Sequence, residues 1–186
     1  MNTPLVIQPY KSAGADVVAV RPYDPVAAEV ARDVGALVEQ AVPGVRVEHV
    51  GSTAVPGCAG KGVVDLMAVC HGVPLANVAA ALETLGFGKQ SGGHQHGDDR
   101  PMREGAVMVR GTWYRLHVHV LAPDAPAVAS FRLFRDRLRA DPALLATYVE
   151  QKRRLVESGV LDRASYSGGK GEFIMGVLRP PPQGDR

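Results

Sequence analysis

Residues 49–69 read HVGSTAVPGCAGKGVVDLMAV, and this stretch contains the most informative pattern of the chain. It begins as the end of an alternating strand, breaks at a Gly-Ser-Thr turn (residues 51–53), passes through small residues to Lys61, and ends in an apolar run. One carboxylate, Asp65, interrupts that run. An ionised carboxylate among apolar neighbours is costly unless a partner, a hydrogen bond or a metal compensates it. The stretch therefore predicts a turn that faces a functional or ion-paired aspartate.

The flanking segments predict a mixed α/β fold with a helical C-terminal third. Apolar residues at helical or alternating spacing define each element, and Asp24, Asp141 and Asp162 are candidate helix caps. Gly168, Gly169 and Gly171 weaken the last helix. The expected elements are a helix at 26–41, strands at 45–50 and 63–70, a helix at 74–86, a hairpin at 106–121 turning near Gly111, and helices at 127–140, at 142–158 and after 162.

The 186 residues are read as one domain over 17–180 preceded by a loose arm over 1–16. A polar, Gly-rich segment at 88–104 is long enough to suggest function. It contains His94 and His96, and we expect it to be mobile and to fold over a bound phosphate as a lid.

Composition narrows the functional class. The formal net charge is +2 and the pI about 8.6, which is too mild to indicate nucleic-acid binding. No apolar run approaches the roughly 20 residues that span a bilayer, and the N-terminal segment does not resemble a signal peptide. The two cysteines, Cys58 and Cys70, lack metal-type spacing and are interpreted as reduced structural thiols, which predicts a cytoplasmic location.

The Gly-Ser-Thr turn and Asp65 together match the needs of a metal–phosphate complex. Gly51 allows close approach of the backbone to a ligand, and Ser52 and Thr53 offer hydroxyl and N–H groups. Lys61 supplies a mobile cation in the same loop. In this interpretation the carboxylate holds a divalent ion and the donors hold phosphates.

A purely structural interpretation is also open. Gly-Ser-Thr is a common turn, and short motifs of this kind produce many false matches. Asp65 could form an ion pair with Lys61 or with Arg115 instead of binding a metal.

His117 and His119 form a second pattern, because residues two apart on a strand project from the same face. If their strand lies beside the strand of Asp65, the imidazoles could ligate a metal or contact phosphates. We therefore expect Asp65, His117 and His119 to converge beside the turn. The alternative is a half-buried, hydrogen-bonded pair. Upstream, Glu48 and His49 alternate, so only one of them faces the same side.

Basic residues are frequent in the C-terminal third and are interpreted as the solvated faces of helices. Tyr166 and Lys170, at helical i, i+4 spacing, could reach a ligand or form a surface pair. The basic cluster consists of Arg132, Arg135, Arg137, Arg139, Lys152, Arg153 and Arg154.

Five segments of the chain together resemble the GrpB family. They are RPYDP, VEHVGSTAVPGCAGKGVVDL, HVHVL, FRDRLRADPALLATYVEQKRRL and SYSGGKGEFI, and the resemblance covers about residues 17–178. That family belongs to the nucleotidyltransferase superfamily and also occurs fused behind dephospho-CoA kinase. The resemblance implies a nucleotidyltransferase-like mixed sheet with helices and further C-terminal helices.

The superfamily pattern, carried over, assigns phosphate contacts to Gly51 and Ser52 and a divalent ion to Asp65. This sequence departs from the pattern at Met67, where a second carboxylate is expected, because a thioether cannot replace a hard oxygen ligand for Mg²⁺. His117 and His119 stand at the position of the third acidic residue.

Two functional hypotheses follow. In the first, the chain is a transferase that binds a nucleoside triphosphate or a phosphorylated small molecule with Mg²⁺ or Mn²⁺. Asp65 and His119 would be catalytic, His117 a further ligand, and Lys61 and Lys170 phosphate contacts. In the second, Met67 leaves too little carboxylate for transfer, and the chain is a nucleotide-binding accessory module with a regulatory or folding role.

Overall fold

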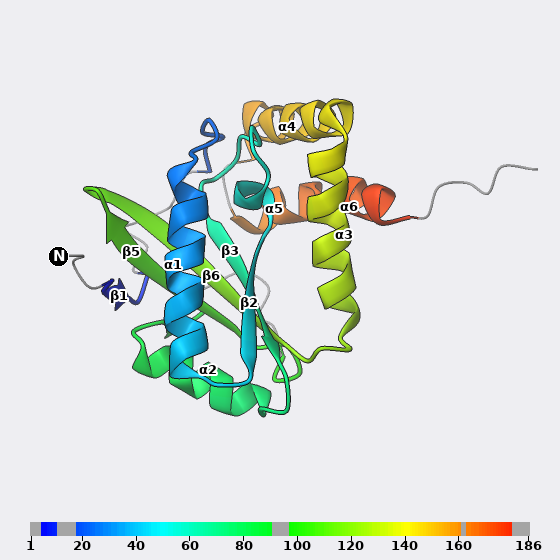
Figure 1. The fold of residues 1–186 in the computed structure, drawn as a ribbon. Coiled ribbons are helices and arrows are strands. Elements are labelled where there is room, and N and C mark those ends of the chain that lie inside the picture. The colour runs from blue at the N-terminus through cyan, green and yellow to red at the C-terminus, as the bar shows by residue number, and fades with distance from the viewer. Residues whose placement is uncertain (1–4, 11–17, 91–96, 161–162, 180–186) are drawn as a thin grey trace, which may run out of the picture.

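A mixed β-sheet lies at the centre of the computed structural model, which describes residues 5–10, 18–90, 97–160 and 163–179. Within these residues six strands form one sheet in the order β1-β5-β6-β3-β2, with β4 paired to β5 (Figure 1). Strands β3 and β6 are parallel, and the other pairs are antiparallel. The strands are β1 (Ile7–Gln8), β2 (Val45–Val50), β3 (Val64–Cys70), β4 (Gly88–Lys89), β5 (Met102–Val109) and β6 (Thr112–Leu121).

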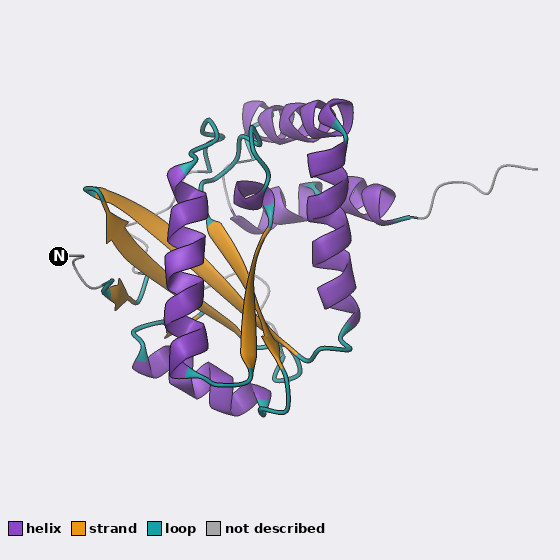
Figure 2. Ribbon diagram, viewed as in Figure 1, coloured by secondary structure: helices purple, strands orange, loops and turns teal. Residues whose placement is uncertain are grey.

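Two helices cover one face of this sheet, and the C-terminal helices lie on the other side of it (Figure 2). The mixed α/β fold with a helical C-terminal third, predicted from the sequence, is therefore confirmed. The helices are α1 (Val26–Ala41), α2 (Leu75–Thr84), α3 (Pro126–Ala140), α4 (Pro142–Glu157), α5 (Arg163–Gly169) and α6 (Gly171–Leu178), with a short 3₁₀ turn η1 (Ser52–Ala54).

The larger core forms between α1, α2 and alternate residues of the central strands. Leu66 of β3 and Val118 of β6 are fully buried there against Val34 of α1 and Leu82 of α2. Burial of side chains of this size stabilises the fold by about 1.5–3 kcal/mol each. Because residues on a strand alternate between faces, this packing turns Asp65 towards the opposite side of the sheet.

On that opposite side, α3 packs over one end of β3 and β6. Met67 and Val69 are buried with Leu121 and with Val128 of α3. A further cluster, centred on Phe134 and Tyr148, joins α3 and α4 to the loop after η1. The C-terminal helices thus cover the β2–β3 side of the face that carries Asp65.

Local sequence signals account for several boundaries. Arg110 and Gly111 both have positive φ (52° and 79°), which gives the β5–β6 hairpin the two-residue turn that matches strand twist. Asp141 caps α4, since its Oδ1 accepts hydrogen bonds from the N–H groups of Ala143 and Leu144, both at 2.9 Å. Asp24 accepts a hydrogen bond from the N–H of Val26 at the start of α1.

Three expectations need correction. Part of the segment expected to be a loose arm is anchored, because Ile7 is buried and pairs with Val107 of β5. The expected loop at 88–104 is shorter, because β4 takes its beginning and β5 its end. The C-terminal glycines do not prevent helix formation, since Gly168 and Gly169 lie within α5 and α6 follows after Lys170.

His94, His96 and Asp162 lie outside the described residues, and the lid over 88–104 stays a prediction. Cys58 and Cys70 are buried and form no disulfide. None of the helices in the described part of the chain has the length and apolar character required to cross a bilayer.

Candidate functional site

Asp65, His117 and His119 converge on the sheet face opposite α1. The parallel register of β3 and β6 places Asp65 beside His117 and Met67 beside His119. His117 Nδ1 lies 3.1 Å from Asp65 Oδ1, and His119 Nε2 lies 4.0 Å from the same oxygen. The predicted convergence of these three side chains is confirmed as geometry.

The Asp65 carboxyl group is held in its ionised form. Burial opposes ionisation, but the hydrogen bond from His117 and the charges of the two histidines and of Lys61 outweigh it, so the pKa falls to about 2. Its side chain is still 24% exposed. A partly buried anion that a ligand can reach is suited to bind a cation or to accept a hydrogen bond.

The backbone of the Gly-Ser turn lies directly against this carboxylate. Gly51 has φ of +69°, and a Cβ atom built on it would lie 2.5 Å from Asp65 Oδ2. Only glycine fits both the backbone conformation and this close approach. Ser52 Oγ borders Gly60, where a Cβ atom would come within 3.2 Å of it.

Thr53 has a structural role that the sequence interpretation missed. Its hydroxyl donates to the carbonyl oxygen of Val63 at 3.0 Å, and His49 Nε2 lies 3.0 Å from the same Oγ1. Because the hydroxyl hydrogen goes to Val63, the imidazole must donate its own N–H. The side chain is 7% exposed and braces the turn, so the expectation that its hydroxyl contacts phosphate is corrected.

Two lysines share one aromatic ring beside the turn. Lys61 Nζ lies 5.0 Å and Lys170 Nζ 4.6 Å from the ring centroid of Tyr166. Burial, together with repulsion from Lys61, lowers the pKa of Lys170 to about 8. Tyr166 is 1% exposed, so the interpretation of Tyr166 and Lys170 as a surface pair was wrong.

Lys152 was assigned to a solvated basic face, yet it is 1% exposed. Its Nζ donates to the carbonyl oxygen of Ala59 and lies 3.1 Å from Cys58 Sγ, and a Cβ atom on Gly60 would approach it to 3.4 Å. Burial lowers the pKa of this amino group. The burial of Lys152 could have been predicted from its position four residues after the aromatic Tyr148, because positions i and i+4 share one face of a helix.

Glu104 and Arg115 extend the site across β6 to β5. Glu104 is 3% exposed, its Oε1 accepts a hydrogen bond from Arg115 at 3.0 Å, and the same oxygen lies 3.6 Å from His117 Nε2. His117 therefore stands between two carboxylates. Sequence reasoning placed Glu104 in a loop, because its strand was expected to begin only at residue 106.

The side chains around Asp65 offer few ligands for a divalent ion. Asp65 Oδ1 and His119 Nε2 are separated by about twice a metal–ligand bond of roughly 2.0–2.2 Å, so both could bind one ion. Met67 is fully buried and offers no hard oxygen. No group of three or more His, Cys, Asp or Glu side chains in the described ranges is arranged to hold a metal. The residues fit one ion completed by ligand oxygens, and they do not fit a two-ion centre.

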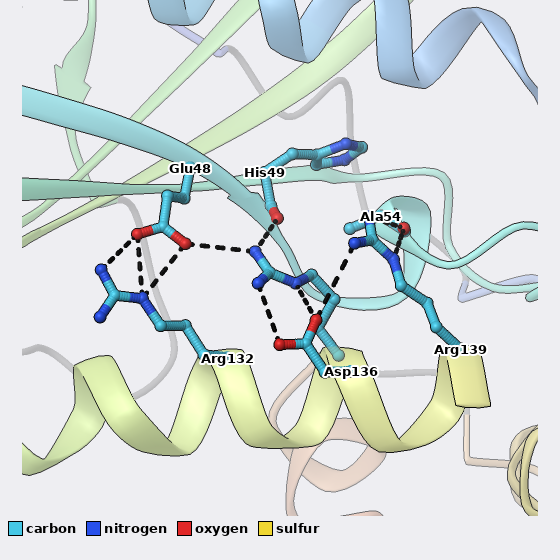
Figure 3. A network of polar contacts seen from close by, with 7 residues as sticks. Glu48, His49, Ala54, Arg132, Asp136 and Arg139 are labelled. Carbon is cyan, nitrogen blue, oxygen red and sulfur yellow. Dashed lines mark hydrogen bonds and ion pairs between the residues drawn. The ribbon is translucent and has the colours of Figure 1, made fainter. Parts of the chain in front are cut away.

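Arginines of α3 hold the strand that precedes the turn (Figure 3). Glu48 of β2 accepts hydrogen bonds from Arg132 and Arg135, and these contacts lower its pKa. Arg135 also donates to the carbonyl oxygen of His49, and Arg139 donates two hydrogen bonds to that of Ala54 at 3.0 and 2.7 Å. Of the neighbours Glu48 and His49, Glu48 therefore lies on the Asp65 face of the sheet, but its carboxylate binds arginines of α3.

This sheet order, with a glycine turn leading into a carboxylate-bearing strand, defines a nucleotidyltransferase-like fold. The chain matches a structure of the Cid1 poly(U) polymerase bound to MgATP with a TM-score of 0.56 at 13% identity, over 82% of this chain and 50% of that one. It therefore spans half the length of that polymerase.

Within this class the chain belongs to the GrpB family, because the family model described as GrpB protein matches residues 17–179. The crystal structure of the conserved protein GrpB from Enterococcus faecalis matches with a TM-score of 0.69 at 24% identity, over 86% of this chain and 94% of that one.

Two relatives are described as UPF0157 proteins. The one from Streptomyces coelicolor is 37% identical over 134 residues, which cover 72% of this chain and 67% of the relative. The one from Pseudomonas aeruginosa is 34% identical over 182 residues, which cover 92% of this chain and 70% of the relative.

Proposed function

We propose that the chain binds a nucleoside triphosphate, or a related phosphorylated small molecule, together with one Mg²⁺ or Mn²⁺ ion. The phosphates would lie between the Gly51–Ser52 turn and the amino groups of Lys61 and Lys170. Asp65 would hold the ion, with His119 as a second protein ligand, while Lys61 and Lys170 would neutralise phosphate charge.

The observation that carries this proposal is the pair of ammonium groups at the ring of Tyr166. Lys61 and Lys170 repel each other, and that repulsion contributes to the lowered pKa of Lys170. A polyanion placed between them would relieve the repulsion and gain charge-assisted hydrogen bonds from both. The ionised Asp65 close by would otherwise repel such a polyanion, and a divalent ion between them reverses the sign of that interaction.

The Cid1 poly(U) polymerase, a structural neighbour, is described in complex with MgATP, a ligand of the class proposed here. The likeness at 13% identity supports the fold only, so the ligand class rests on the charges of this site.

Isothermal titration with ATP, UTP, GTP and CTP, with Mg²⁺, with Mn²⁺ and with EDTA, tests the proposal. We expect at least one triphosphate to bind more tightly with metal, and Asp65→Asn to remove the metal-dependent part. Lys170→Met should weaken binding about tenfold or more, because it removes a charged contact. Asp33→Asn and Lys89→Met, which change exposed side chains away from the site, serve as matched controls.

Failure of all four triphosphates to bind, or full metal-dependent binding by Asp65→Asn, would contradict the proposal. The proposal would also be contradicted if Lys170→Met bound the triphosphate normally while the control Asp33→Asn lost binding.

A second candidate function, binding without transfer, is favoured by Met67. In nucleotidyl transfer an acceptor hydroxyl attacks the α-phosphorus, its proton passes to a base such as His119, and pyrophosphate leaves. Two-ion phosphoryl sites need carboxylates that bridge both ions. The donor set here fits one ion, so we expect binding with little or no release of pyrophosphate. Release of pyrophosphate from a triphosphate labelled at the γ-position measures this directly, and robust turnover would establish a transferase whose histidines replace the carboxylate.

A further inference from the structure

A second hollow opens on the same face of the sheet, next to the β5–β6 hairpin. Its volume is about 240 Å³, just below the roughly 300–1,000 Å³ typical of small-ligand sites. Strands β5 and β6, the loop that carries Lys61 and the segment from Val18 to Arg21 surround it. In Figure 1 the tip of the hairpin lies at the edge of the sheet that is far from α3, α4 and α6.

The lining of this hollow combines cations with aromatic rings. Arg21, Lys61 and Arg115 border it, together with Tyr10 and Trp113. Trp113 is 51% exposed, which is unusual for a large apolar side chain in a folded protein. A cationic wall beside an accessible indole ring fits a ligand that carries both an anionic group and a flat aromatic ring.

Arg115 is already oriented for such a ligand. Its guanidinium group donates to the buried Glu104 at 3.0 Å and lies 4.3 Å from the ring centroid of Tyr10. Its side chain is only 13% exposed. Because these contacts limit its rotamers, binding would cost little further side-chain entropy.

The hollow is distinct from the triphosphate site but connected to it. Asp65, Gly51, Ser52 and the residues of α3 to α6 are all absent from its lining, and Lys61 alone borders both. A continuous polar path runs from Arg115 through Glu104 and His117 to Asp65. A group bound in the hollow would therefore lie beside the site proposed for metal and phosphates.

We propose that this hollow binds a second ligand of the nucleoside monophosphate class, with its phosphate on Arg21 and Arg115 and its base against Trp113. This inference rests on the proposed function, because it places the second ligand beside a first nucleotide. The first nucleotide would contact the turn, Lys61 and Lys170, and the second would occupy the open half of the sheet face.

Trp113 is the single tryptophan of the chain, so the protein's tryptophan fluorescence reports on the surroundings of this one ring. We expect adenosine 5′-monophosphate to quench it in EDTA, and adenosine or inorganic phosphate alone to bind at least tenfold more weakly. Arg21→Ala should weaken the monophosphate at least tenfold, whereas Arg46→Ala, which changes an exposed arginine on β2, should not. Calorimetry with Trp113→Leu tests the stacking, with a similar loss expected.

A saturating triphosphate with Mg²⁺ should leave the affinity for the monophosphate within about threefold. Strict competition between the two would show one ligand spanning both regions and would overturn the inference. Equal affinity of Arg21→Ala and Arg46→Ala would overturn it too. If the monophosphate fails to bind while a triphosphate binds, the inference falls and the proposed function stands. If the monophosphate alone binds, the proposed function falls and the hollow is the nucleotide site.

Discussion

His49 shows how one side chain stabilises the shape of the glycine turn. It lies near the end of β2, and its imidazole N–H donates to Thr53, whose hydroxyl in turn donates to the carbonyl oxygen of Val63, the residue before β3. Burial, together with the charges of Arg139 and Arg135, lowers the pKa of His49 to about 4 against the opposing effect of Asp65. The ring is therefore neutral in the folded protein at neutral pH.

This lowered pKa predicts a pH-dependent stability. The unfolded chain takes up a proton on His49 near pH 6.5, whereas the folded chain does so only near pH 4. The contribution is therefore complete above about pH 6.5 and is lost as the pH falls towards 4. We expect the free energy of unfolding to drop by about 1–2 kcal/mol between pH 7 and pH 5 through this residue.

Urea unfolding at pH 7 and pH 5 measures the effect. In His49→Gln the side-chain amide can still donate to Thr53 but does not titrate, so the drop should shrink by that amount. His71→Gln, which changes an exposed histidine, should retain the drop of the unaltered protein. Equal pH dependence in both variants would contradict the assignment.

At the level of elements, α3 is attached to β2 mainly by arginines. Arg135 is 14% exposed and joins Glu48, Asp136 and the carbonyl oxygen of His49, whereas Arg132 and Arg139 remain about half exposed. Ion pairs at exposed positions contribute little, but removing one partner of a shielded pair leaves the other without compensation. Arg135 should therefore dominate the attachment.

We expect Arg135→Ala to lower the free energy of unfolding by about 1–3 kcal/mol, because it leaves Glu48 and a carbonyl oxygen with fewer donors. Arg154→Ala removes an exposed i, i+4 pair with Glu150 and should cost less than about 0.5 kcal/mol. Urea unfolding at pH 7 and low salt compares the two variants. Similar losses would show that the buried contacts of Arg135 carry no special weight.

In the whole molecule, the C-terminal helices cover apolar residues on the Asp65 side of the sheet. Val50, Met67 and Leu121 are at most 1% exposed, and α3 supplies Val128 to the same cluster. Without these helices the sheet would present a contiguous apolar patch next to its site. The domain proposed over 17–180 should therefore unfold as one cooperative unit.

Truncation tests this directly. A chain of residues 1–125 should lack a cooperative urea transition and should aggregate, because loss of α3 to α6 exposes that patch. A chain of residues 1–179, which retains every described helix, should unfold like the full chain. Two separate transitions in the full chain, or a stable and soluble 1–125, would show that the sheet and the helices are independent.

Much of the local structure could be read from the residues alone. The helix at 26–41 and the strand at 45–50 have the predicted bounds, and the hairpin turns at Gly111 as expected. Strand periodicity also placed His117 and His119 on one face, whereas their position beside Asp65 depended on the pairing of β6 with β3. These features depend on spacing and turn chemistry within short segments.

The partners of single side chains were decided by packing between segments that are distant in sequence. Whether Thr53 offers its hydroxyl to a ligand depends on Val63 and His49, and whether Lys152 and Tyr166 are exposed depends on how α4 and α5 pack beside the turn. Glu104 joined the site because β5 begins earlier than its residue pattern indicated. Composition and periodicity assign a residue to an element and a face, but burial and hydrogen bonding also require the neighbouring element, which only the folded chain supplies.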